Sequence, residues 1–139
     1  MNKTDMAKII ALVKVAFPRY MEGFDDEMKI AAVNYWMEIL GKYPVELVFY
    51  ATKEYLFNER DQYQSDNVPL LIRDYVWAIQ EQVNADLPWR KFRYPALNDY
   101  VTKENDKAYR LKMEKKKAEL ERKKQRVMRL EERKAENEN

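Results

Sequence analysis

The stretch DDEMKIAAVNYWMEILG, residues 25–41, carries the pattern that decides the fold. Asp25 is a typical N-cap, and the two acids after it lie in the first turn, where the helix dipole favours negative charge. Gly41 is typical of a residue that ends a helix, in the position called C′. Between these ends the apolar residues recur at spacings of three and four, which predicts a helix. Its predicted buried face consists of Met28, Ala32, Tyr35, Trp36, Ile39 and Leu40.

The same helical spacing continues on both sides of this stretch. Towards the N-terminus it predicts a helix with Thr4 as N-cap, which ends at Phe17 because Pro18 disfavours helical geometry there. Pro44 and Pro69 each fit the start of a further helix. No segment shows the alternation typical of strands. The sequence therefore predicts an all-α body of four helices, whose remaining inward residues are Met6, Ile9, Ile10, Val13, Ala16, Phe17, Leu47, Val48, Ala51, Tyr55, Ile72, Tyr75, Val76, Ile79 and Val83.

Composition divides the chain into unlike parts. Residues 1–86 hold 13 of the 18 aromatic residues and are acidic, with 9 basic and 14 acidic side chains. Residues 103–139 hold 14 Lys or Arg, 9 Asp or Glu and a single aromatic. Since only the first part can bury a core, we predict a helical domain at 1–86, a Pro/aromatic/basic linker at 87–102, and a charged helical or disordered tail at 103–139. The polar run Asn58–Asn67 is predicted to be a surface loop.

Residue types that most catalytic sites need are missing. The chain has no Cys and no His, which removes thiolate nucleophiles, the commonest general base and the commonest zinc ligands. Gly23 and Gly41 are isolated, so no phosphate-binding loop can form. We therefore expect no enzymatic activity, no metal site and no cofactor.

The apolar segments are short. No run of about 18 apolar residues is present, and Ile9–Phe17 is interrupted by Lys14 and lies inside an amphipathic pattern. We therefore expect no membrane contact and a cytoplasmic location in a bacterial host cell.

Two regions are candidates for binding a partner. Trp89, Arg90, Lys91, Phe92, Arg93 and Tyr94 interleave cations with aromatics, a combination that suits phosphate contact or an anchor in a partner groove. The alternative is a linker that folds its aromatics back onto the helices. Outside the main stripes, Phe49, Tyr50 and Phe57 add more aromatics than a small core hides, which predicts a partly exposed apolar patch.

The second candidate region is the tail. Met113, Leu120 and Val127 repeat every seven residues, but Lys116 and Lys123 interrupt the seam, which is too thin for a confident coiled coil. The tail is either a solvated or disordered segment, a docking arm, or a nonspecific nucleic-acid contact. Its 9 acids among 14 bases weaken attraction to phosphate, which favours a protein target.

Four short motifs in the helical body resemble a known family. They are AFPRY at residues 16–20, NYWMEIL at 34–40, PVELV at 44–48 and NVPLLIRDY at 67–75. Together they resemble the small phage proteins that load and inhibit the replicative DnaB-type helicase. The resemblance covers roughly Asp5 to Gln82 and implies an all-helical domain with Trp36 in its core. At Val68-Pro69 this chain departs from the family's usual Phe-Pro-Pro-like helix start, and its basic tail matches no motif.

The resemblance implies a function by binding. Family members have no ATPase machinery, hold the helicase inactive and pass it to an origin-bound initiator. We therefore predict a phage replication accessory protein that binds the helicase and, through its other end, an initiator. Two alternatives stay open: a small DNA-binding protein that uses its basic C-terminal arm, and a structural protein that dimerises through Met113, Leu120, Val127 and Leu130.

Overall fold

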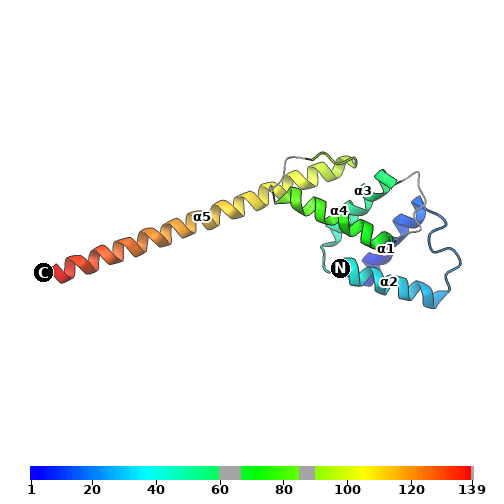
Figure 1. The fold of residues 1–139 in the computed structure, drawn as a ribbon, viewed down its shortest axis with the longest axis horizontal. Helices are drawn as coiled ribbons and strands as arrows, with labels where there is room; N and C mark the ends of the chain where they lie inside the picture. The colour runs from blue at the N-terminus through cyan, green and yellow to red at the C-terminus, as the bar shows by residue number, and fades with distance from the viewer. Residues whose placement is uncertain (60–66, 85–89, 139) are drawn as a thin grey trace.

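The fold was taken from a computed structural model that describes residues 1–59, 67–84 and 90–138. These residues form five helices and no strand, which confirms the predicted all-α class. Figure 1 shows four helices gathered at one end and the fifth extending far beyond them to the C-terminus. The helices are α1 (Lys3–Ala16), α2 (Asp26–Leu40), α3 (Val45–Glu59), α4 (Val68–Val83) and α5 (Pro95–Glu138).

Helix α3 lies at the centre of the body. It packs against α1, α4 and the beginning of α5, while α2 packs against α1 and α4. Its predicted face is buried: Val48, Ala51 and Tyr55 are fully enclosed, and the ring of Tyr55 meets the edge of Phe17 at 6.3 Å. The inward faces predicted for α1 and α4 are also largely buried, apart from Ala16, which is exposed.

The ends of α1 and α2 show which capping predictions hold. Asp25 accepts a hydrogen bond from the backbone N–H of Met28 at 2.8 Å, which confirms it as an N-cap. The prediction of Thr4 was wrong: α1 begins earlier, at Lys3, because Asn2 and Asp5 cap each other reciprocally. Gly41 ends α2 with right-handed helical angles, so it does not use the left-handed conformation expected of a C′ glycine.

The buried face of α2 is narrower than predicted. Trp36 and Leu40 are buried, but Met28 is 51% exposed and Tyr35 is 41% exposed. This part of the prediction was wrong because α2 lies at the edge of the body, where it packs against α1 and α4. Its apolar residues therefore exceed what these two contacts can cover.

Helix α5 begins earlier than the composition indicated. Pro95 is its first residue, and Leu97 and Val101 in its first turns are fully buried. Residues 95–102, predicted to be part of a linker, are thus helical and belong to the core. Residues 90–105 are called the root of α5 below. The predicted loop Asn58–Asn67 also differs, since α3 includes Asn58 and Glu59; residues 60–66 lie outside the described part of the chain.

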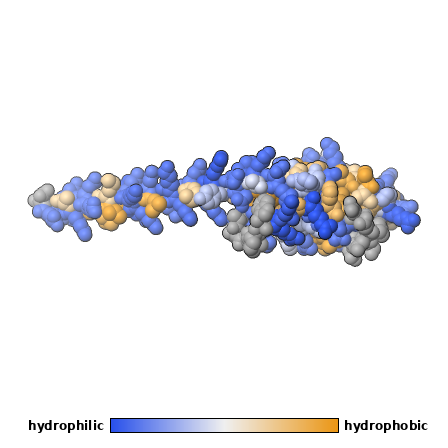
Figure 2. Space-filling model, turned by 90° about the horizontal axis from the view of Figure 1, so that it is seen from above, coloured by the Kyte–Doolittle hydropathy of each residue, from blue (hydrophilic) through white to orange (hydrophobic). Residues whose placement is uncertain are grey.

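Beyond the root, α5 leaves the body. All residues from 109 to 138 are exposed, and they are called the arm below. At 1.5 Å per residue the arm is about 45 Å long. In Figure 2 it is mostly hydrophilic, with separate hydrophobic spots along its length, whereas the body carries broader hydrophobic areas. Among the described helices, none combines the length and apolar character needed to cross a bilayer.

Candidate interaction surfaces

The root of α5 is attached to α3 by a buried carboxylate. Glu54 is only 4% exposed, and its two oxygens accept the backbone N–H groups of Arg93 at 3.1 Å and Tyr94 at 2.9 Å. These donors immediately precede α5, whose N-terminal dipole favours a negative charge. Asn58 also donates to Glu54, at 3.3 Å. Glu54 therefore fixes the place where α5 begins.

Three amides complete the attachment of the root. The side chain of Gln82 on α4 accepts the N–H of Arg90 at 2.8 Å. Asn105 donates back to the carbonyl oxygens at the end of α4, those of Gln82 and Val83, each at 3.1 Å. Asn98 both accepts from the N–H and donates to the carbonyl of Phe92, so it holds the segment before α5 by two hydrogen bonds.

Aromatic residues cover the junction between α3 and the root. The ring of Tyr50 lies 4.8 Å from that of Tyr100 and 6.0 Å from that of Tyr94, and Phe57 lies 5.4 Å from Tyr94. Phe49 packs against Tyr50 at 5.5 Å. The surplus aromatics that predicted an exposed patch are therefore partly covered by α5, although Phe57 remains 40% exposed.

The predicted binding segment at the root separates into unlike residues. Phe92 is 4% exposed and belongs to the core, so its side chain does not face a partner. Tyr94 is half-buried in the aromatic group. The basic members remain exposed, while Trp89 lies outside the described residues; the exposed ones are Arg90, Lys91 and Arg93.

A hydrophobic groove lies between α2 and the start of α4. It has a volume of about 570 Å³ and includes the exposed side chains of Phe24, Met28 and Tyr35. Tyr35 also accepts a hydrogen bond from Asn67 across the groove. Sequence reasoning missed this surface because it assigned Met28 and Tyr35 to the core. The signal was present: α2 has apolar residues on more than one face, such as Ile30, which is 61% exposed.

A second exposed aromatic lies on α4. Trp77 is 43% exposed and donates its indole N–H to the hydroxyl of Tyr43 at 2.8 Å. The guanidinium of Arg73 stacks on the Trp77 ring, 4.3 Å from its centroid. These contacts fix the indole in one orientation. Trp and Arg are among the residue types that most often dominate protein interfaces.

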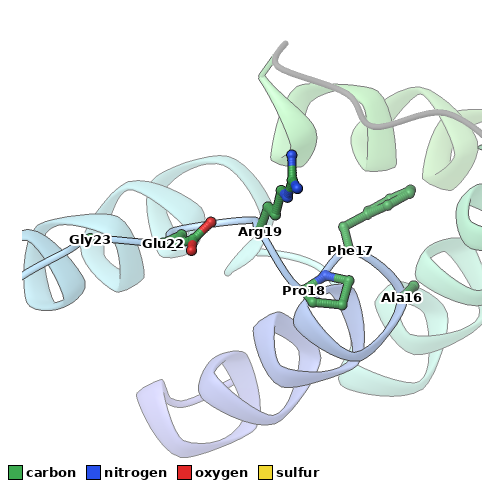
Figure 3. A pocket seen from close by; sticks show the side chains of 6 residues that line it. All are labelled: Ala16, Phe17, Pro18, Arg19, Glu22 and Gly23. Atoms are coloured by element: carbon green, nitrogen blue, oxygen red, sulfur yellow. The ribbon is translucent and has the colours of Figure 1, made fainter.

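The loop from α1 to α2 encloses a hollow of about 790 Å³. Figure 3 shows Arg19 extending away from Pro18, while Phe17 is turned towards the helices. Met21 and Gly23 in this loop have positive φ angles of 63° and 82°. Beneath the loop, Tyr20 accepts the indole N–H of Trp36 at 3.2 Å, which places Trp36 in the core as the family resemblance implied.

The predicted apolar seam of the tail is exposed along the arm. Met113 is 48% exposed, Leu120 58% and Val127 53%. Tyr109 and Leu130 extend the seam at either end and are also exposed. Within the part of the chain that the structure describes, the body leaves these side chains uncovered, so the seam is open to a partner.

The described residues contain no group of three acidic side chains placed to hold a metal ion. Polar groups inside the body are instead engaged in holding helices together, as Glu54 and Gln82 show. The apolar surfaces that bear on a partner are thus the α2–α4 groove and the arm seam.

Comparison with known proteins bears on the first three helices. Residues 1–62 match the family model for the N-terminal domain of the phage gp39 helicase loader/inhibitor-like proteins. Neither the comparison with curated proteins nor that with solved structures gave a match. The matched segment contains α1, α2 and α3, with Trp36 and most of the α2–α4 groove. The match confirms the resemblance that the motifs indicated. Through this N-terminal domain, the chain belongs with the gp39 family of phage helicase loader/inhibitor-like proteins.

Proposed function

We propose that this protein binds the replicative DnaB-type helicase of a bacterial host and controls its loading onto DNA. The observation that carries the proposal is the family match over residues 1–62. The proposed place of action is the host cytoplasm. Its mechanism is binding and release, without ATP hydrolysis, because the sequence has no glycine-rich loop with which to hold a triphosphate.

Two separated apolar surfaces support an adaptor role. The α2–α4 groove lies on the body, while the seam of Met113, Leu120 and Val127 lies on the arm. We assign the helicase to the arm seam and an origin-bound initiator to the body. Two modest contacts on one chain raise the overall affinity through effective concentration, and the complex still dissociates when a competitor takes one of them.

The seam has the chemistry of a helicase contact that survives salt. Its side chains are apolar and about half-exposed, so a partner groove can remove them from water. Burying one leucine side chain fully contributes about 1.5–3 kcal/mol. Since this term does not depend on charge, binding should persist between about 50 and 300 mM salt.

The arm offers a matched pair of variants for the test. Leu120 and Leu111 are 58% and 57% exposed, yet their spacing of nine residues places them on opposite sides of the helix. Leu120→Lys introduces a charge into the seam, whereas Leu111→Lys introduces the same charge on the other side. Full-length protein carrying either change would be tested for retention on the immobilised host helicase.

We expect Leu120→Lys to weaken helicase binding by about 10- to 100-fold, as the loss of about 1.5–3 kcal/mol implies. Leu111→Lys should bind as the unaltered chain does. If the unaltered protein is not retained at all, the proposed function is wrong. If both variants bind equally well, the helicase contact does not use the seam.

A further inference from the structure

The charged residues of the arm are sorted by face. Arg122, Arg126, Arg129 and Arg133 follow one another at spacings of four, three and four residues, which places them in one line along the helix. Lys115 continues this line two turns earlier. All of these positions are exposed, and Lys112, Lys116, Lys123 and Lys134 flank the line on one side.

The acids of the arm mostly occupy a different stripe. Glu114, Glu121 and Glu132 are separated by seven and eleven residues, spacings that return to the same side of a helix. Between Lys115 and Arg133, Glu119 is the acid that falls among the basic residues. The near balance of charge in the composition therefore hides a strongly basic face.

The arginine line is repulsive within the isolated helix. Arg126 has arginines at positions 122 and 129 and no acid three or four residues away on either side. Like charges at these spacings destabilise a helix. An anionic partner laid along the line would remove this repulsion. The line runs for about 16 Å, from Arg122 to Arg133.

The chemistry of this face fits phosphate better than a protein surface. Protein interfaces have an apolar centre and are depleted in lysine. The line from Lys115 to Arg133 consists of cations, and further lysines border it. Arginine binds phosphate oxygens through its planar fork, and DNA presents such groups at regular intervals.

We propose that the arginine line of the arm binds DNA through its phosphates. The line lies roughly 150° around the helix axis from the seam of Met113, Leu120 and Val127, at 3.6 residues per turn. The arm can thus contact a protein on one side and DNA on the other at the same time. The inference does not rest on the identity of the protein partner.

The test uses full-length protein and fluorescently labelled DNA, one probe single-stranded and one duplex. Anisotropy titrations from about 50 to 300 mM salt give the slope of log affinity against log salt, about −0.7 per phosphate contact for single strands and −0.9 for duplex. We expect the variant Arg122→Gln, Arg126→Gln, Arg129→Gln to bind at least about tenfold more weakly and to reduce the slope by about 2–3. The two probes show whether single strands or duplex are preferred.

The control removes the same charge from another face. Arg110, Lys117 and Lys124 lie beside the seam, away from the arginine line. Changing all three to Gln should weaken DNA binding by less than half as much on the logarithmic scale. Circular dichroism on both variants checks that the arm stays helical, which is expected because glutamine is a good helix former.

Three outcomes would overturn the proposal. The unaltered protein does not bind either probe at about 50 mM salt; both triple variants lose DNA affinity equally; or the arginine variant loses helicase retention while its DNA binding is unchanged. The last result would assign the line to an acidic protein surface. Retention of helicase by the unaltered chain without DNA binding would refute this proposal and leave the proposed function standing.

Discussion

Glu54 and Tyr94 lie 40 positions apart in the sequence, and the buried carboxylate of the first accepts the backbone N–H of the second at 2.9 Å. The same carboxylate accepts the N–H of Arg93. Through these two bonds a residue of the family-matched domain fixes the start of a helix that lies outside the match.

Replacing Glu54 by Gln should therefore destabilise the body. The amide keeps one acceptor oxygen but turns an NH₂ group towards one of the two backbone donors, which leaves that donor unsatisfied. We expect a loss of about 2–3 kcal/mol in the free energy of unfolding, measured by urea denaturation. Glu38→Gln on exposed α2 makes the same charge change and should stay within about 0.5 kcal/mol. Equal effects of the two changes would show that Glu54 is not an anchor.

The smallest stable unit should include the root. Phe92, Leu97 and Val101 are at most 4% exposed, so a chain of residues 1–86 lacks part of its core. Residues 1–106 should unfold cooperatively with nearly the midpoint of the full chain. Residues 1–86 should lose roughly 5 kcal/mol or more, which is comparable to the whole stability of a small domain. Thermal melts followed by circular dichroism compare them, and equal midpoints would restore the boundary at residue 86.

The loop between α1 and α2 should stabilise the core through Tyr20. Its hydroxyl accepts the indole N–H of Trp36, which is 1% exposed, and the two rings meet edge-on at 6.2 Å. Tyr20→Phe removes the acceptor, and a buried donor left without a partner costs about 1–3 kcal/mol. Urea denaturation followed by tryptophan fluorescence measures the change. Tyr109→Phe on the exposed arm is the control and should have no measurable effect on stability.

Tyr100 should make the protein sensitive to alkali. Burial at the root, with smaller contributions from Glu104 and Glu46, raises the pKa of its hydroxyl from 10.0 to about 12. The unfolded chain therefore loses this proton near pH 10, while the folded chain keeps it. The contribution of Tyr100 to stability is complete below about pH 10 and declines as the pH rises towards about 12. Thermal midpoints of Tyr100→Phe should fall less over this interval; a parallel decline in both proteins would contradict the assignment.

The sequence predicted what depends on local chemistry. Asp25 caps α2, Pro69 lies in the first turn of α4, and the faces of α1, α3 and α4 follow from spacing. These features need only a few neighbouring residues. The family resemblance, confirmed over residues 1–62, rests on motifs in the same helices.

What could not be predicted depends on contacts between distant segments. Pro95 was interpreted as a break, although proline also suits the first residue of a helix, and the choice depends on whether Phe92 finds a place in the core. Met28 and Tyr35 have the spacing of core residues, but the helices that pack against α2 leave their side of it exposed. Binding by the seam and by the exposed cations of the root stays a prediction.

The unbroken course of α5 from its buried root into solvent has a consequence for the arm. An isolated helix must first fix one turn at a large entropic cost, whereas adding residues to an existing turn is nearly free. Because Glu54, Asn98 and the buried Leu97 already hold the first turns in place, the arm needs only propagation and no nucleation of its own. A competitor that pulled the root off α3 would thus melt a recognition surface extending some 45 Å away, without touching it.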